Sequence, residues 1–417
     1  MIERLSQKLY TIKKYPEELG LLKAVIFDMD GVIIDSEPLH AKAAVLALEK
    51  YKVSVQIEYA YGFIGTTTSV MSRKMIEDFH LTITAEELLK ANEDAKEYLL
   101  KAEGYPIIPY VKELMEDLHR NGMKLIIASS SSSAAIESVM KSLQIENLFD
   151  GYISGTAMKQ PKPAPDIFLA AAKQLGVEPS ECIVIEDSYN GVSAAVAAGI
   201  TCLGFLNPNS GKQDLSQADI LAEGFEEVNY PFLHQVYQRA HMEPVTILTT
   251  EHCILRELSP EDADTLYQIC EKPEISAHLE EFTHDSTIER DKLSAYIKYI
   301  YSFYGFGYWG VYLSGSNRLI GRCGIEWKEF DGEAIYELGY FIDPDFQGKG
   351  YGSEIVCAAI KYCMKELAIP KIVAFIAPDN FKSLRLAEQV GLNKVGECRK
   401  NQKYYDRYEI ININNDI

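Results

Sequence analysis

The first apolar run of the chain reads Lys23-Ala24-Val25-Ile26-Phe27-Asp28-Met29-Asp30-Gly31. A short apolar run that ends in charge is typical of a strand buried on both faces of a parallel sheet. The two-residue period of extended chain places Asp28 and Asp30 on one side of the strand end. Gly31 then allows the backbone to turn sharply. The stretch predicts a sheet edge that carries acidic chemistry.

Strand-like runs of the same kind recur further along the chain, at Lys124–Ala128 and Cys182–Ile185. A helix is expected between them over Val111–Arg120, because its apolar residues fall on one face. This alternation predicts an α/β fold with an open, doubly wound sheet. Residues 37–105 are charged and rich in helix formers, so we expect an all-helical insertion after the first strand.

The pattern changes after about residue 232. Apolar and polar residues now alternate, which predicts an α+β domain whose sheet is mostly antiparallel, with one solvated face. The expected strands and the helix that follows them lie at Thr246–Glu257, Tyr308–Leu313, Arg322–Trp327, Tyr336–Ile342 and Ser353–Leu367.

These patterns predict two domains. The first spans residues 1–236, with a core at about 20–36 and 106–232 that the helical insertion at about 37–105 interrupts. A short linker at 237–245 leads to the second domain at 246–417. The length of 417 residues gives each domain enough chain for a sizeable core.

Composition narrows the classes of function. The 41 Lys and Arg against 61 Asp and Glu give a net charge of −20, and both halves are acidic, which argues against a nucleic-acid partner. No apolar run approaches the roughly 18 residues of a membrane span, and the polar start lacks a signal peptide's apolar core. The eight cysteines are scattered without a Cys-x-x-Cys pair. We therefore expect a cytoplasmic enzyme with no nucleic-acid or membrane partner.

Further polar residues stand at expected strand ends. Glu186 and Asp187 follow a second strand, Ser129 ends a third, and Lys162 lies in a proline-stiffened loop. Clustered carboxylates repel one another and need a cation, for which Mg²⁺ is the best match to oxygen ligands. A strand end with a polar cap would explain the Asp-x-Asp pair alone, but not the whole set.

The order Asp-x-Asp-Gly, Ser, Lys, Glu-Asp resembles the haloacid dehalogenase superfamily, over about residues 20–232. The likeness is greatest to the β-phosphoglucomutase and sugar-phosphatase branch, through the stretches Phe27–Val32, Lys162–Phe168 and Ile185–Gly191. It implies a Rossmann-like core whose nucleophile is Asp28, which would form an aspartyl-phosphate. Asp30 would then be the acid and base.

The resemblance assigns further roles. Ser129 and Lys162 would bind the phosphoryl oxygens, and Mg²⁺ would be held by the carboxylates of Asp28, Asp30, Glu186 and Asp187. The helical insertion would be a cap that closes over the site, with His40 at the hinge and Thr66 on the substrate side. A helix-surface histidine is the alternative for His40.

A glycine-rich stretch of the second domain, Gln347-Gly348-Lys349-Gly350-Tyr351-Gly352, follows a strand and precedes a helix. Free backbone N–H groups at the positive end of a helix suit a pyrophosphate. A plain tight turn is the alternative. The stretch is neither a Walker A motif nor a Rossmann fingerprint, since the preceding sheet is expected to be antiparallel.

The surrounding sequence, from Glu337 through Gly352, resembles the acetyl-CoA motif of the GNAT N-acetyltransferases, and the likeness covers about residues 246–417. It implies that the loop, including Gln347, Lys349 and Tyr351, binds the CoA pyrophosphate through the backbone of its glycines. Asn380 and Ser383 would lie beside the pantetheine and thioester. Glu337 is where some members place a general base; an exposed strand glutamate is the alternative.

Together these resemblances imply a bifunctional enzyme. One domain would hydrolyse a small phosphorylated metabolite with Mg²⁺, and the other would transfer acetyl from acetyl-CoA to an amine of a small molecule or a protein N-terminus. Two alternatives stay open: a β-phosphoglucomutase-type phosphomutase at the first site, or a sensor or scaffold in which one domain binds its ligand without turnover.

Overall fold

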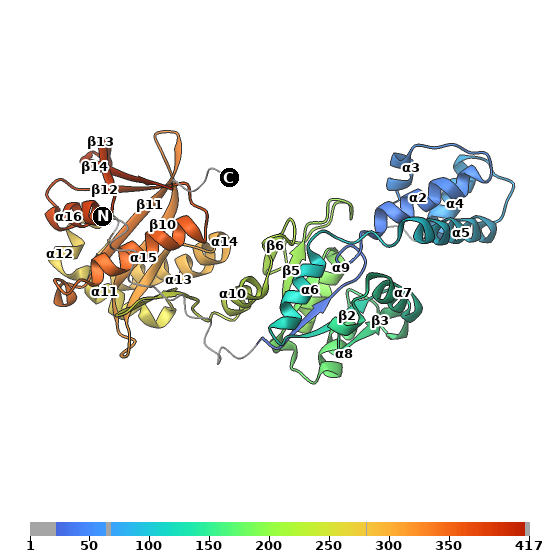
Figure 1. Cartoon of the computed structure of the whole chain (residues 1–417), viewed down its shortest axis with the longest axis horizontal. Helices are drawn as coiled ribbons and strands as arrows, with labels where there is room; N and C mark the ends of the chain where they lie inside the picture. Colours follow the sequence, from blue (N-terminus) through green and yellow to red (C-terminus); the bar gives the residue numbers. More distant parts are fainter. Residues whose placement is uncertain (1–21, 64–67, 281, 413–417) are drawn as a thin grey trace. The chain divides into compact units, whose positions relative to one another are not determined.

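The computed structural model describes residues 22–63, 68–280 and 282–412. The chain divides into two compact units, Gly20–Ala240 and His241–Ile417, each with its own sheet (Figure 1). Among the helices of the described residues, none has the length and apolar character needed to cross a membrane.

The first unit is built on a parallel sheet in the order β3-β2-β1-β4-β5-β6. Its strands are β1 Ala24–Phe27, β2 Lys124–Ser129, β3 Gly151–Ser154, β4 Cys182–Glu186, β5 Thr201–Phe205 and β6 Ile220–Ala222. The expected doubly wound α/β architecture is confirmed.

Helices cover both faces of this sheet, because each strand directs alternate side chains to opposite faces. Val25 and Phe27 pack with one helical layer, and Ala24 and Ile26 pack with the other. The first layer contains α6 Val111–Arg120, α7 Ser133–Leu143 and α10 Tyr230–Ala240, and the second contains α8 Asp166–Leu175 and α9 Tyr189–Ala198.

Helix α10 continues to Ala240 and so includes the first four residues that the sequence assigned to a linker. The reason is packing: Leu233 and Tyr237 are buried in the core, and the Tyr237 hydroxyl donates to the Ser180 carbonyl at 2.7 Å.

The expected insertion is helical. It consists of α2 Ser36–Glu49, α3 Ile57–Tyr61, α4 Thr68–Asp78 and α5 Ala85–Glu103, which surround a small core of their own (Figure 1). A capping box fixes the start of α5, where Thr84 accepts from the Glu87 amide at 3.2 Å and the Glu87 carboxylate accepts from the Thr84 amide at 2.8 Å.

The second unit has a mostly antiparallel sheet, as expected. Its strand order is β13-β14-β12-β11-β10-β9-β8-β7. Its strands are β7 Thr246–Thr249, β8 Cys253–Arg256, β9 Tyr308–Leu313, β10 Leu319–Phe330, β11 Glu333–Ile342, β12 Lys371–Ile376, β13 Asn393–Lys400 and β14 Lys403–Ile411. Its helices are α11 Ala263–Glu271, α12 Pro273–Ser276, α13 Ser286–Tyr296, α14 Ser302–Tyr304, α15 Tyr351–Lys365 and α16 Phe381–Gln389, with a π-helical segment at Ile297–Tyr301.

One pair of strands in this sheet is parallel. β11 and β12 pair only at Tyr336 with Ile372 and at Glu337 with Val373. The residues of β11 after Glu337 have no partner on β12 in the described register, so the two strands separate there.

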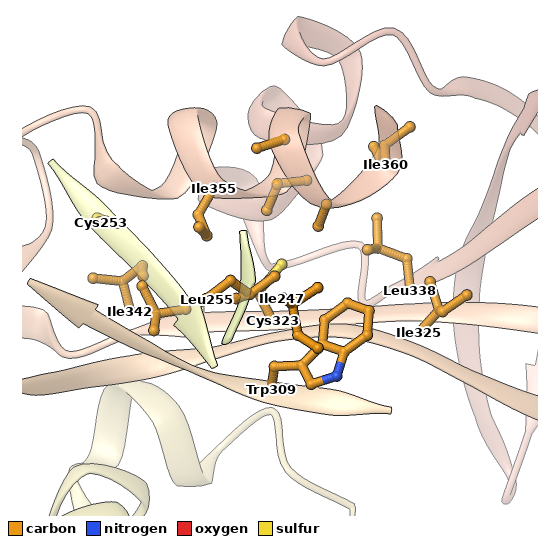
Figure 2. Packing of buried hydrophobic residues seen from close by; sticks show 14 of the residues in the cluster. Ile247, Cys253, Leu255, Trp309, Cys323, Ile325, Leu338, Ile342, Ile355 and Ile360 are labelled. Atoms are coloured by element: carbon orange, nitrogen blue, oxygen red, sulfur yellow. The ribbon is translucent and has the colours of Figure 1, made fainter. Parts of the chain in front are cut away.

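Helix α15 lies across one face of this sheet (Figure 2). Its side chains Ile355 and Ile360 pack toward Cys323, Ile325 and Leu338 of the strands. The helix begins at Tyr351, two residues earlier than expected, because Gly350 in a left-handed conformation (φ +89°) forms its N-cap. It ends at Lys365.

Candidate functional site

The acidic residues of the first unit come together at one edge of its sheet. Phe27 of β1 pairs with Ile127 of β2 and with Ile185 of β4, so the carboxyl ends of the three strands lie level. Asp28, directly after β1, donates its amide to the Ile185 carbonyl at 3.0 Å. The nucleophile candidate is thereby tied to the strand that carries Glu186.

Lys162 stands between two of these carboxylates. Its Nζ lies 2.5 Å from Asp28 Oδ1 and 2.7 Å from Glu186 Oε1, and it also donates to the Ala128 carbonyl at 3.3 Å. Glu186 Oε2 accepts from the Ser188 amide and hydroxyl, both at 2.9 Å. The structure therefore brings together the strand-end acids and the lysine that the sequence singled out.

The charges at this edge are only partly balanced. Burial raises the pKa of Asp28 well above its usual value; Lys162 opposes the rise, while Glu186 adds to it. Burial and the neighbouring Glu186 raise the pKa of Asp187 to about 7. Burial lowers the pKa of Lys162, but the ion pairs with Asp28 and Glu186 outweigh it and raise the value. The edge is a place where further positive charge would be stabilising.

Asp30 is held by the serine run that ends β2. Ser131 Oγ donates to Asp30 Oδ2 at 2.7 Å, and Ser129 Oγ donates to the same oxygen at 3.4 Å. The Ser129 hydroxyl also accepts from the Ser131 amide at 3.0 Å. On the other side of the site, the Ser210 hydroxyl donates to Asp187 Oδ2.

Two cap residues face Asp30. His40 on α2 and Lys96 on α5 are both partly buried. Burial and the charge of Lys96 lower the pKa of His40 to about 4, whereas Asp30 opposes this change. Burial also lowers the pKa of Lys96, again opposed by Asp30. His40 is thus a partly buried group near the site and not a helix-surface histidine, and Thr66 lies outside the described residues.

The glycine loop of the second unit is open toward solvent. Gly348 (φ +76°) and Gly350 (φ +89°) have left-handed conformations, and a Cβ on either would meet no atom of the described residues within 4 Å. Within that part of the chain, no side chain caps the first turn of α15. The first N–H groups of the helix therefore point into space that a ligand can occupy.

The side-chain amide of Gln347, the first residue of the loop, forms hydrogen bonds through both its nitrogen and its oxygen. Gln347 Nε2 donates to the Ile342 carbonyl at 2.7 Å, and Lys382 Nζ donates to Gln347 Oε1 at 2.7 Å. Lys349 Nζ lies 5.0 Å from the centre of the Phe346 ring. The loop thus has two ammonium groups close to it.

The other residues predicted to contact the cofactor lie at the starts of α15 and α16. Tyr351 opens the helix, with its ring 6.0 Å from that of His252. A Cβ on Gly352 would make ordinary contact with Leu386 at 3.6 Å. Asn380 forms the N-cap of α16 by accepting from the Ser383 amide at 3.1 Å.

Glu337 is a buried residue, with 8 % of its surface exposed, and not an exposed strand glutamate. Its carboxylate lies 2.9 Å from Lys400 Nζ through Oε1 and 2.9 Å from Lys328 Nζ through Oε2. Burial raises the pKa of Glu337, but the two lysines outweigh it and lower the value. Glu337 is therefore ionised and a weak proton acceptor in this state.

Comparisons with known proteins identify the families of the two units. Residues 22–199 match the family model of the haloacid dehalogenase-like hydrolases. The probable pseudouridine-5'-phosphatase of Drosophila melanogaster is 33% identical over 199 residues, which are 46% of this chain and 85% of that protein. The chain belongs to the haloacid dehalogenase-like hydrolase family. Residues 252–393 match the model of the acetyltransferase (GNAT) domain, so the second unit is a GNAT domain.

Two further relatives align with the hydrolase domain. The fructose-1-phosphate phosphatase YqaB of Escherichia coli is 32% identical over 178 residues, 42% of this chain and 92% of that protein. Protein SUPPRESSOR OF QUENCHING 1, chloroplastic, of Arabidopsis thaliana is 36% identical over 193 residues, 45% of this chain. The alignment spans only 18% of the length of that Arabidopsis protein.

The hydrolase domain has the donors that suit Mg²⁺. Asp28, Asp30, Glu186 and Asp187 supply hard oxygen atoms. Burial, together with the neighbouring acidic groups, raises the pKa of Asp28 and Asp187, and a bound cation would oppose that rise. Among the described residues, no three acidic, histidine or cysteine side chains are arranged as a metal-binding group. Lys162 instead contacts both Asp28 and Glu186.

A pyrophosphate at the glycine loop would meet open space, because a Cβ on Gly348 or Gly350 has no atom of the described residues within 4 Å.

Sequence reasoning missed three neighbours of the two sites. Ser131 lay inside the serine run but was not distinguished from Ser129. Lys96 and Lys382 are lysines on helices, and nothing in a helical pattern shows which charged residue faces a site.

Proposed function

We propose that the chain is a bifunctional enzyme. Its hydrolase domain is a Mg²⁺-dependent phosphatase for a small, sugar phosphate-like monoester, and its GNAT domain transfers acetyl from acetyl-CoA to an amine. The observation that supports the first activity most is the position of Lys162 between Asp28 and Glu186, with Asp30 held beside them. These groups are a nucleophile, a proton carrier and a cation, all at one sheet edge.

The chemistry would proceed in two displacements. An oxygen of Asp28 attacks the phosphorus, the bond to the leaving alcohol breaks, and Asp30 gives that oxygen a proton. Asp30 then takes a proton from water, which attacks the aspartyl-phosphate and releases inorganic phosphate and the free carboxylate. Lys162 and Ser129 hold the phosphoryl oxygens. Mg²⁺, when bound by Asp28, Asp30, Glu186 and Asp187, supplies positive charge that offsets the phosphoryl charge.

The test of this proposal is hydrolysis of a panel of sugar and nucleotide monophosphates. Asp28→Asn keeps the shape of the side chain but removes its nucleophilic charge, so turnover should fall at least about 100-fold. The matched control is Asp214→Asn, which changes an exposed aspartate outside the site and should leave turnover unchanged. Near-normal turnover by Asp28→Asn, or by the unaltered protein in excess chelator, contradicts the proposal.

The observation that supports the second activity is the open loop at Gly348 and Gly350 ahead of α15, whose first turn has no side-chain cap among the described residues. Acetyl transfer would begin when the amine nitrogen attacks the thioester carbonyl. The carbon–sulfur bond then breaks, the amide nitrogen loses a proton, and the CoA thiolate gains one. Asn380 and Ser383 would lie along the pantetheine.

Glu337 is the candidate general base in this scheme. Lys328 and Lys400 lower the pKa of Glu337. If Glu337 is the general base, activity should depend on these two lysines as well as on Glu337. Glu337→Gln separates the possibilities: a base role predicts a large fall in kcat with little change in KM for acetyl-CoA. Calorimetry with acetyl-CoA tests the binding step itself, and the absence of heat with the unaltered protein would refute the acetyltransferase proposal.

A further inference from the structure

Arg322 on β10 carries its charge into the interior of the GNAT domain. Its neighbour Cys323 is fully buried in the core that α15 covers, so the alternation of the strand directs Arg322 to the opposite face. The Arg322 side chain is partly buried there. In register it stands beside Phe341 of β11 and Gly310 of β9.

Two aromatic rings lie beside the Arg322 guanidinium. Its Cζ lies 4.9 Å from the ring centre of Tyr308 and 5.7 Å from that of Phe341. Within the described ranges, no hydrogen bond or ion pair reaches the guanidinium. Glu326 on the same face is engaged elsewhere: it accepts from the Tyr296 hydroxyl at 2.8 Å and pairs with Lys328 at 3.2 Å.

Burial of this guanidinium is offset by nearby charge but not by hydrogen bonds. Burial lowers the pKa of Arg322, but its neighbours, including Tyr296 and Glu326, outweigh burial and raise the value. The cation–π contacts leave its five N–H donors without hydrogen-bond partners among the described residues. An anionic ligand would satisfy those donors, and the guanidinium fork matches a carboxylate or a phosphate with two parallel hydrogen bonds.

Arg322 lies on the face of the sheet opposite α15. Ile325 and Leu338 pack toward α15 (Figure 2), so the alternation of β10 and β11 directs Arg322 and Glu337 to the other face. The candidate general base Glu337, which stands where β11 leaves β12, would take its proton from an amine on this face. Arg322 stands on that other face, beside Phe341 in the separated part of β11.

We propose that Arg322 binds an anionic group, a carboxylate or a phosphate, on the amine that the GNAT domain acetylates. This inference rests on the acetyltransferase activity proposed above, and it narrows the acceptor to amines that carry a negative charge. The rings of Tyr308 and Phe341 hold the guanidinium plane in place for that group. Polyamines, which carry only positive charge, are poor acceptors on this view.

The experiment compares matched amines in the full-length chain. The pairs are histamine with histidine, for a carboxylate, and glucosamine with glucosamine 6-phosphate, for a phosphate. Release of the CoA thiol is followed for the unaltered GNAT domain, Arg322→Gln and Arg322→Lys, all in the Asp28→Asn background so that the phosphate ester survives. Arg385→Gln, at an exposed position on α16, is the control.

The expected result is that at least one amine with an anionic group exceeds its partner without one about tenfold in kcat/KM. Arg322→Gln should raise KM for that anionic amine about tenfold or more, leave KM for its partner and for acetyl-CoA within about twofold, and be partly rescued by Arg322→Lys. Which pair responds distinguishes carboxylate from phosphate.

Three results overturn the inference. The amines without an anionic group are preferred, Arg322→Gln lowers kcat/KM for both members of a pair alike, or acetyl-CoA binds but neither amine with an anionic group is acetylated. Failure of the unaltered protein to bind acetyl-CoA is a different outcome, because it contradicts the proposed acetyltransferase function together with this inference.

Discussion

Gly31 and Asp187 approach each other so closely that a Cβ on Gly31 would stand 1.9 Å from Oδ2 of Asp187. Gly31 also has a left-handed conformation (φ +87°). Gly31→Ala should therefore push the Asp187 carboxylate out of place and lower phosphatase turnover at least about 10-fold, with a loss of unfolding free energy of about 1 to 3 kcal/mol from backbone strain. Steady-state kinetics and denaturant unfolding measure the two effects.

Gly122→Ala provides the control. Gly122 has a similar conformation (φ +78°), but its added Cβ would meet no atom of the described residues within 4 Å. This variant should lose stability to a comparable extent and keep its turnover. Equal turnover in the two variants would show that the contact with Asp187 has no bearing on the reaction.

Removal of Lys162 should expose the charge imbalance of the hydrolase site. Lys162→Gln leaves Asp28 and Glu186 buried without their ammonium, so in chelator the free energy of unfolding should fall by about 3 to 5 kcal/mol. Mg²⁺ should restore part of this loss, and the loss should shrink at low pH as the acids take up protons. Denaturant unfolding with and without Mg²⁺ measures it, with Lys159→Gln in the same loop as the exposed control.

The lowered pKa of His40 predicts a pH dependence of stability. The folded chain holds His40 neutral down to about pH 4, while the unfolded chain protonates it near the usual 6.5. Between these values the unfolded state binds more protons, so stability falls as pH falls, by up to about 3 kcal/mol. His40→Gln should flatten the slope of unfolding free energy over this window. An unchanged slope would mean that His40 titrates normally.

The glycine loop predicts the behaviour of a charged variant. Gly350→Glu adds a side chain and a negative charge where the pyrophosphate would lie, so acetyl-CoA binding should be abolished in calorimetry. Phosphatase turnover should survive, because the two sites belong to separate sheets. Gly315→Glu, at another left-handed glycine with open space around it, controls for strain and charge.

Lys382→Ala should weaken acetyl-CoA binding more modestly, about 10-fold, because Lys382 contacts Gln347 at the start of the loop. Lys365→Ala at the far end of α15 removes the same charge and should have no effect. Equal losses in the two lysine variants would indicate a general effect of charge and not a contact near the cofactor.

Release of phosphate should outrun isomerisation at the hydrolase site. A mutase must hold its phosphorylated intermediate away from water by specific cationic contacts from the cap, and the stretch Tyr61–Thr68 contains no Arg or Lys. Arg73 on α4 donates to Ser69 at 3.0 Å. With β-glucose 1-phosphate and a trace of the 1,6-bisphosphate, free phosphate should exceed glucose 6-phosphate. The reverse order would establish the mutase alternative.

The strand-end chemistry was predictable because a parallel sheet aligns its carboxyl ends. Once Ala24–Phe27 and Cys182–Glu186 were recognised as strands, Asp28 and Glu186 had to share an edge. The family resemblance supplied the role of Lys162, and the structure brings its ammonium between those two carboxylates. Strand period and position carried most of this information.

Other features depended on packing that no local pattern encodes. Glu337 was expected either as a base or as an exposed glutamate, and its ion pairs with Lys328 and Lys400 join residues from different strands. Lys96 is one of several charged residues on α5, and only the placement of the cap selects it. Helix α10 extends into the segment expected to be a linker because Tyr237 is buried in the core.

The amide of Asp28 bonded to the carbonyl of Ile185 makes the reactive carboxylate and the acids of β4 parts of one rigid body. Within the described residues, the helices α2 to α5 join that body through the segments around residues 30–36 and 104–108, where Ile34 bridges to Ile107. Under the proposed function, the groups that break the phosphate ester and the residues that select the substrate then belong to different parts of the domain. Substitutions within residues 37–103 are expected to change the accepted metabolite while the acids at the strand ends keep their places.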